Sequence, residues 1–146
     1  MTLWNIKGQQ IFGSHFKPLL QTNAAPCVIF WHGNGGWRLD SYEVVEMLLP
    51  WGITVFTFDF TGSGNSDGEM ASLGFYEKQD IGTVVKYLWD HGKVSSIGLW
   101  GRSMGAVACL LYAATDPTMA YVVADSPYSD LTTLSLDIMT KNFKLP

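Results

Sequence analysis

Charged residues are scarce in this sequence, and the basic ones form no cluster. Charged side chains make up 15% of the 146 residues and hydrophobic ones 47%, a balance that suits a sheet covered by helices and excludes a disordered chain. The nine Lys and Arg residues are scattered, and the formal net charge is −4. Because a phosphate-binding surface needs clustered cations, we expect no nucleic-acid partner.

Cysteine is rare as well, and no apolar run is long. Cys27 and Cys109 fall in apolar segments that read as a strand and a helix, so we expect two buried thiols and no disulfide framework. No run approaches the roughly 20 apolar residues that cross a bilayer. Residues 1–7 lack the basic and apolar pattern of a secretory signal. The sequence therefore predicts a cytoplasmic protein with no membrane span.

Strand-like and helical patterns alternate along the chain. Residues 3–6 and 9–16 flank a Lys7-Gly8 turn and predict an opening hairpin. Continuous apolar runs predict strands at 27–31, 53–58, 96–100 and 120–124, and helical spacing predicts helices at 40–51, 75–89, 106–114 and 131–139. This alternation predicts an α/β fold with a mostly parallel sheet and helices on both faces.

The segment 101–105 reads Gly-Arg-Ser-Met-Gly and lies where a predicted strand passes into a predicted helix. This is the context of the Gly-x-Ser-x-Gly nucleophile elbow, a crowded turn whose flanking positions lack bulky side chains while the serine oxygen projects above the sheet. The helix N-terminus beside the serine also favours negative charge. Ser103 is therefore the candidate nucleophile. The plainer alternative is a glycine-rich turn with a helix-capping serine.

A second glycine-rich segment, His-Gly-Asn-Gly-Gly at 32–36, follows the first central strand. Acyl transfer needs backbone N–H groups aimed at the oxygen that becomes negative in the tetrahedral intermediate, and small residues allow that approach. We predict an oxyanion hole formed by the backbone N–H groups of Asn34 and Met104. A glycine turn that serves packing alone is the alternative.

The three histidines are poor candidates for the general base. His32 precedes the nucleophile at the end of another strand and is expected to shape its loop. His15 lies in the opening hairpin, and His91 ends a helix expected on the outer face of the sheet. A serine hydroxyl is a weak nucleophile without a histidine in hydrogen-bond reach. We therefore expect these 146 residues alone to be inactive or nearly so.

Two aspartates follow predicted strands. Asp59 is expected to anchor the glycine-rich turn after it through backbone N–H groups, and not to act in catalysis. Asp125 ends the strand after the nucleophile helix and is kept as a candidate catalytic acid. Arg102 is expected either to pair with Asp80 or Glu77 of the preceding helix or to be exposed and unpaired.

Four segments together resemble the α/β-hydrolase superfamily, especially its serine aminopeptidase-like (peptidase S33-like), esterase and acyl-thioesterase branches. They are Phe-Trp-His-Gly-Asn-Gly at 30–35, Phe-Asp-Phe-Thr-Gly-Ser-Gly-Asn-Ser-Asp-Gly at 58–68, Gly-Arg-Ser-Met-Gly at 101–105 and Asp-Ser-Pro at 125–127. The resemblance covers almost the whole chain. It implies Ser103 as the nucleophile and the Asn34 and Met104 amides as the oxyanion hole.

In that superfamily the catalytic acid and histidine follow the serine along the chain, after later strands. Those strands are absent here, so residues 1–146 are expected to be the N-terminal part of the domain, from the opening hairpin to the strand after the elbow. We expect a truncated sequence. A complementing chain that supplies the remaining third, or a non-catalytic remnant, are the alternatives.

The leading hypothesis is a serine hydrolase that cleaves a carboxylic ester, thioester or amide of a small-molecule or acylated substrate. It acts through an acyl-serine intermediate, with no metal and no organic cofactor. The alternative is an inactive half-domain that serves as a binding or assembly module. Nucleotide or flavin binding is disfavoured, because residues 33–36 lack Gly-x-Gly-x-x-Gly spacing and no phosphate-binding lysine follows them.

Overall fold

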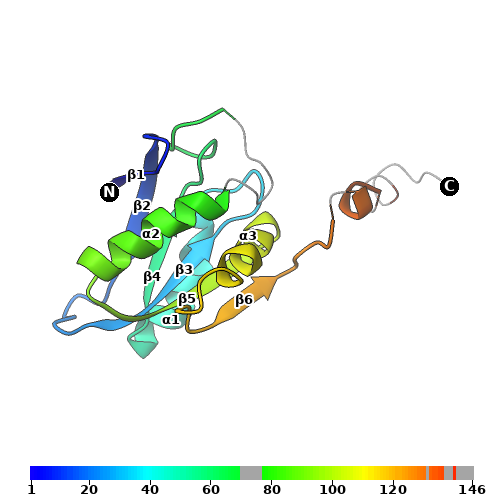
Figure 1. Ribbon diagram of the computed structural model, residues 1–146. Helices are drawn as coiled ribbons and strands as arrows, with labels where there is room; N and C mark the ends of the chain where they lie inside the picture. Colours follow the sequence, from blue (N-terminus) through cyan, green and yellow to red (C-terminus); the bar gives the residue numbers. More distant parts are fainter. Residues whose placement is uncertain (70–76, 131, 137–139, 141–146) are drawn as a thin grey trace.

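In the part of the chain that the structure describes, six strands form one sheet with helices packed against it (Figure 1). The computed structural model describes residues 1–69, 77–130, 132–136 and 140. The strands are β1 (Thr2–Trp4), β2 (Gln10–Phe16), β3 (Ala25–Trp31), β4 (Thr54–Phe58), β5 (Val94–Arg102) and β6 (Val122–Asp125), in the spatial order β1-β2-β4-β3-β5-β6. β4, β3, β5 and β6 are parallel, while β2 is antiparallel to β1 and β4. The expected mostly parallel α/β sheet is confirmed.

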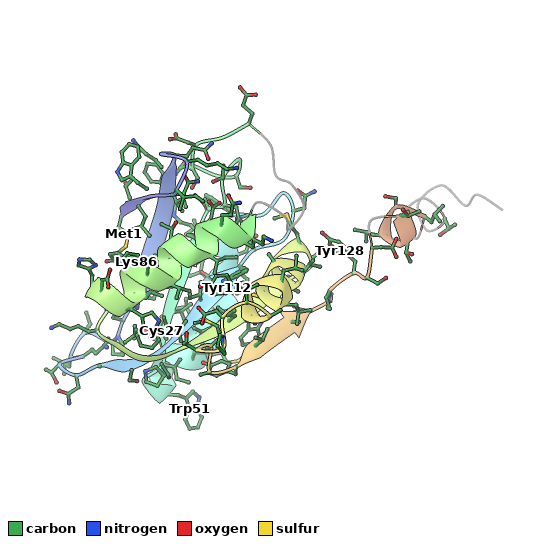
Figure 2. All side chains as sticks on the ribbon, viewed as in Figure 1. Met1, Cys27, Trp51, Lys86, Tyr112 and Tyr128 are labelled. Carbon is green, nitrogen blue, oxygen red and sulfur yellow. The ribbon has the colours of Figure 1, made fainter. Side chains whose placement is uncertain are left out.

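The helices divide between the two faces of the sheet. α2 (Glu77–His91) and α3 (Met104–Ala113) cover one face, and α1 (Tyr42–Leu48), flanked by the 3-10 turns η1 (Arg38–Ser41) and η2 (Leu49–Trp51), covers the other. The helical stretch from η1 to η2 ends at Gly52, whose φ is 74°, directly after the predicted helix at 40–51. Trp51 beside it projects outward and is 82% exposed (Figure 2). None of the helices in the described part of the chain has the length and hydrophobicity of a membrane span.

Alternating strand residues supply a core on each face. In β3, Ile29 and Trp31 join the core under α2 and α3, whereas Phe30 packs against α1. β5 follows the same alternation, so Trp100 packs on the α1 side and Arg102, two residues on, points the same way. Because both faces of the central strands are covered, their residues are apolar almost throughout.

The two cysteines are buried and free, which confirms the expected thiols. Burial raises the pKa of the Cys27 thiol in β3 to about 11, and burial also raises the pKa of Cys109 in α3. Both thiols therefore stay protonated near neutral pH and pack as small apolar groups.

The opening hairpin forms as predicted, but its first strand is shorter. β1 ends at Trp4 because the side-chain oxygen of Asn5 accepts hydrogen bonds from the Lys7 and Gln9 N–H groups, at 2.9 and 3.0 Å, and so builds the turn. Residues 132–136 are helical, as predicted. The rest of the predicted helix at 131–139, and Phe75 at the start of another, lie outside the described residues.

The parallel strands decide where a site can form. β3, β4, β5 and β6 all end at the same edge of the sheet, so the loops that follow them gather there (Figure 1). These loops carry the segments 32–37 and 59–69, the serine at 103 and, after β6, the residue at 126. Ligands of parallel α/β sheets bind at this edge.

Candidate active site

Ser103 occupies a strained turn between β5 and α3. Its backbone has φ 53° and ψ −113°, a combination that residues with a Cβ rarely adopt and that costs on the order of 1–3 kcal/mol. Two backbone hydrogen bonds hold the turn. The Ser103 N–H donates to the Asp125 carbonyl at 2.8 Å, and the Val107 N–H donates to the Ser103 carbonyl at 3.2 Å. This is the backbone geometry that a nucleophile elbow requires.

Glycines on either side of the serine let the turn pack tightly. A Cβ on Gly101 would overlap the backbone of Gly105, and a Cβ on Gly105 would overlap the carbonyl oxygen of Trp31 in β3. α3 therefore starts closer to the sheet than any larger residue would allow. The Gly-x-Ser-x-Gly spacing is a direct result of this contact.

The glycine-rich loop after β3 lies against the serine. A Cβ built on Gly33 would stand 3.5 Å from the Ser103 Cβ. The loop turns at Gly35, with φ 74°, and the Gly36 N–H donates to the Gly33 carbonyl at 3.0 Å. The structure thus brings together the two segments that carry Asn34 and Met104, which begins α3. The role of their N–H groups as oxyanion donors stays a prediction.

His32 is fully engaged in holding this loop. Its side chain is buried, Nδ1 lies 2.8 Å from the Gly33 carbonyl oxygen, and the Phe60 N–H donates to Nε2 at 3.3 Å. Because Nε2 accepts, the ring proton sits on Nδ1 and is donated to Gly33. The ring also packs edge-to-face on Phe60, with centroids 4.9 Å apart. His32 therefore shapes the loop and is not poised to deprotonate Ser103.

The other two histidines lie at the opposite edge of the sheet. His15 in β2 hydrogen-bonds Thr54 Oγ1 at 3.1 Å, where β4 begins, and His91 ends α2 with its ring stacked on Tyr87. None of the three histidines is placed as a base for Ser103. Within the described residues, no three His, Cys, Asp or Glu side chains gather closely enough to hold a metal ion.

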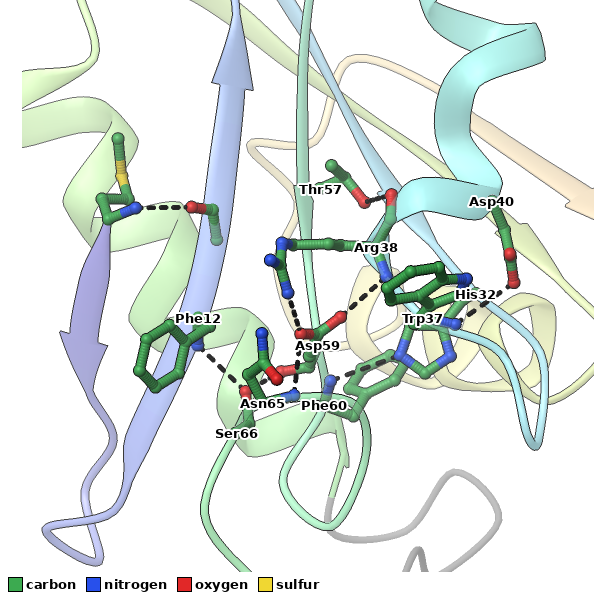
Figure 3. Close-up of polar contacts among 12 residues, drawn as sticks. Phe12, His32, Trp37, Arg38, Asp40, Thr57, Asp59, Phe60, Asn65 and Ser66 are labelled. Atoms are coloured by element: carbon green, nitrogen blue, oxygen red, sulfur yellow. Dashed lines mark hydrogen bonds and ion pairs between the residues drawn. The ribbon is translucent and has the colours of Figure 1, made fainter.

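Asp59 anchors the turn after β4, as expected, and also binds an arginine that the sequence does not reveal. The aspartate is fully buried, and the Asn65 N–H donates to its Oδ2 at 3.1 Å. The Arg38 N–H donates to Oδ1 at 2.7 Å, and the Arg38 guanidinium pairs with Oδ2 (Figure 3). Arg38 belongs to the stretch after β3, and neither spacing nor motif links it to Asp59.

Arg102 pairs with Asp125 and Glu43, so the two expected alternatives, a pairing with Asp80 of α2 and an unpaired arginine, are both wrong. Its Nε donates to Asp125 Oδ2 at 2.9 Å, and its guanidinium lies 3.6 Å from the Glu43 carboxylate of α1. Asp80 instead accepts a hydrogen bond, 3.0 Å long, from the opening hairpin. The reason is the alternation in β5, which points Arg102 toward the α1 face while α2 covers the other. The Glu77 side chain lies outside the described residues.

Asp125 reaches the same edge as Ser103, but its carboxylate is already engaged. The Ser126 hydroxyl donates to Oδ1 at 2.8 Å and Arg102 to Oδ2. The hydroxyl of Ser126, and next the guanidinium of Arg102, lower the pKa of Asp125. The contact with Ser103 is made by the Asp125 backbone carbonyl. Asp125 therefore helps to hold the elbow, and its role as catalytic acid stays a prediction.

Proteins of known fold share this architecture. A family model described as alpha/beta hydrolase fold matches residues 26–144. The Pyrococcus furiosus esterase Pf2001 superimposes with a TM-score of 0.87, at 28% identity, over 100% of this chain and 58% of its own. The Bacillus subtilis protein YqkD is 34% identical over 84% of this chain, and rat monoglyceride lipase is 29% identical over 99%. The chain spans 40% of the length of YqkD and 50% of the length of the lipase. It belongs to the α/β-hydrolase family.

Proposed function

We propose that the chain carries the nucleophile of a serine hydrolase that cleaves a carboxylic ester, thioester or amide through an acyl-serine intermediate. The observation that carries this proposal is the strained Ser103 turn with Gly33 packed against it, because strained backbone conformations cluster at active sites. The relatives support the hydrolase class, since one is an esterase and another is a lipase.

In this mechanism the Ser103 Oγ attacks the acyl carbon while its proton passes to a histidine base. The acyl oxygen becomes an oxyanion and accepts hydrogen bonds from the Asn34 and Met104 N–H groups, close to the N-terminus of α3. Collapse of the tetrahedral intermediate expels the alcohol, thiol or amine, which takes the proton from the histidine. Water then attacks the acyl-serine with the same assistance and releases the acid.

The base for this mechanism comes from outside these 146 residues. His32 is held by Gly33 and Phe60, and the remaining histidines lie at the far edge of the sheet. Further polypeptide, either continuous with this chain or in a complementing chain, supplies the histidine. Asp125 is the candidate acid that the sequence offers within the chain, but its carboxylate is bound by Ser126 and Arg102, so we expect the acid to come from that further polypeptide as well.

A binding or assembly module is the second candidate function, and the placement of the histidines favours it. Without a base the Ser103 hydroxyl stays a weak nucleophile. Such a module would bind its partner through the exposed apolar residues of the β6 segment, where Tyr121 and Val123 are 41% and 38% exposed.

Intact mass after treatment with a fluorophosphonate probe tests the proposal. The probe is applied to this chain, to a form extended through the downstream coding sequence, and to Ser103→Ala and Ser126→Ala variants of the extended form. Ser126 is the matched control, because it also has a positive φ, 56°, and follows the neighbouring strand β6.

We expect the extended form and its Ser126→Ala variant to gain one phosphonyl adduct and Ser103→Ala to gain none. If the extended form is folded and does not react, the hydrolase proposal is refuted and the binding module takes its place.

A further inference from the structure

The loop formed by residues 33–37, the oxyanion loop, is held internally by the single hydrogen bond from the Gly36 N–H to the Gly33 carbonyl. Three of its five residues are glycines, and Asn34 is exposed. Glycine backbones sample more conformations than those of other residues. An oxyanion donor, however, has to stay within about 0.5 Å of its working position. Groups outside the loop must therefore fix it.

The first restraint lies at the start of the loop. His32 donates to the Gly33 carbonyl and accepts the Phe60 N–H, so its imidazole links the first peptide of the loop to the segment after β4. With its side chain 1% exposed, these two hydrogen bonds are shielded from competing water.

The second restraint lies at the end of the loop. Arg38 follows Trp37 directly, and both its backbone N–H and its guanidinium bind the Asp59 carboxylate. Its carbonyl oxygen accepts the Thr57 hydroxyl at 2.9 Å, so three contacts tie this one residue to the end of β4 (Figure 3). Side-chain exposure is 19% for Arg38 and 0% for Asp59. A desolvated pair of this kind is directional, and losing either partner leaves an uncompensated buried charge.

We infer that the Arg38–Asp59 ion pair positions the oxyanion loop, with His32 as the second anchor, so that the end of β4 holds the Asn34 N–H in its working place. The inference rests on the proposed function. Asp59 is a positioning residue, because it acts through Arg38. An oxyanion forms only in the transition state, so weakening this restraint lowers kcat more than it raises KM.

Asp59→Asn is the informative variant, and Asp67→Asn is its matched control. Asparagine keeps the shape of Asp59 but places an NH2 group where a carboxylate oxygen accepted Arg38 or Asn65. Asp67 lies in the same segment after β4, and its carboxylate accepts the Gln10 N–H at 2.8 Å, on the hairpin side. Hydrogen exchange of residues 33–37 is measured in the 146-residue chain. kcat and KM for a p-nitrophenyl ester are measured in the extended form.

We expect Asp59→Asn to speed amide exchange in the loop by about 10-fold or more and to lower kcat by about 10- to 100-fold, with KM changed less than about threefold. Asp67→Asn should match the wild type in both measurements. Arg38→Lys, which keeps the backbone N–H and one charged donor, should show smaller changes in the same direction. It replaces Asp59→Asn as the test variant if Asp59→Asn does not fold.

The positioning role is overturned if the two aspartate variants behave alike, or if kcat falls while loop exchange is unchanged. Failure of the proposed function looks different, because the wild-type extended form would then neither react with the probe nor turn over ester. In that case a loop that loosens in Asp59→Asn and not in Asp67→Asn still supports the restraint.

Discussion

The strain at Ser103 predicts that removing its Cβ stabilises the fold. We compare Ser103→Gly with Ser103→Ala, because both variants lack the hydroxyl and differ only in the Cβ. At φ 53° and ψ −113° the Cβ costs on the order of 1–3 kcal/mol. Glycine gives back about 0.5–1 kcal/mol through the greater entropy of the unfolded chain. The free energy of unfolding should therefore be about 1 kcal/mol higher for Ser103→Gly.

Urea unfolding at 25 °C, followed by tryptophan fluorescence, measures this difference. With a slope near 2 kcal/mol per molar urea, the midpoint should rise by about 0.5 M. Ser95→Gly is the matched control, since Ser95 is an exposed residue of β5 without a positive φ, and there glycine should destabilise by about 0.5–1 kcal/mol. An unfolding midpoint for Ser103→Gly at or below that of Ser103→Ala would show that the turn is not strained.

Three further predictions concern packing, pH and charge. Gly105→Ala should lower the free energy of unfolding by about 2–3 kcal/mol, because the new Cβ meets the β3 backbone. The control Gly82→Ala in α2 should raise it by about 1 kcal/mol. Thermal melts of both variants, compared with the wild type, measure these differences. Burial, and next the charge of a nearby lysine, lower the pKa of His15 to about 4 from 6.5, so the folded protein favours the neutral ring. The neutral ring therefore contributes to the free energy of unfolding in full above about pH 6.5, and this contribution is lost as the pH falls toward 4. Discounted for partial exposure, the loss is about 1–2 kcal/mol, and urea unfolding near pH 7 and pH 4 should show it in the wild type and not in His15→Gln. Asp125→Asn should change the free energy of unfolding by less than about 0.5 kcal/mol. In the extended form it should change the rate of fluorophosphonate labelling by less than about threefold. A fall in the labelling rate near 10⁴-fold would instead identify Asp125 as the catalytic acid.

The sequence is sufficient to predict the features that depend on neighbours along the chain. Apolar runs and helical spacing predict the alternation of strands and helices, because each pattern is local. The elbow at 101–105 is predictable for the same reason, because the close contact between Gly101 and the Gly105 backbone lies within the motif. Asp59 as a turn anchor is likewise a matter of a few residues.

Contacts between distant segments could not be predicted in the same way. The Arg38–Asp59 pair depends on β3 and β4 lying side by side, which no spacing in the sequence reports. The partner of Arg102 depends on which face of β5 it occupies and on β6 being the next strand. The alternation of β5 excludes a partner on α2, and that signal was present in the sequence. The choice of Asp125 and Glu43 needed the strand order.

The hydrogen bond from Ser103 to Asp125 also makes the nucleophile turn depend on β6. The acceptor of the Ser103 N–H lies 22 residues further along the chain, on the strand that pairs with β5. A chain that ended before Asp125 would therefore contain the whole Gly-Arg-Ser-Met-Gly motif but would keep only one of the two backbone hydrogen bonds that hold its turn, the one from the Val107 N–H to the Ser103 carbonyl.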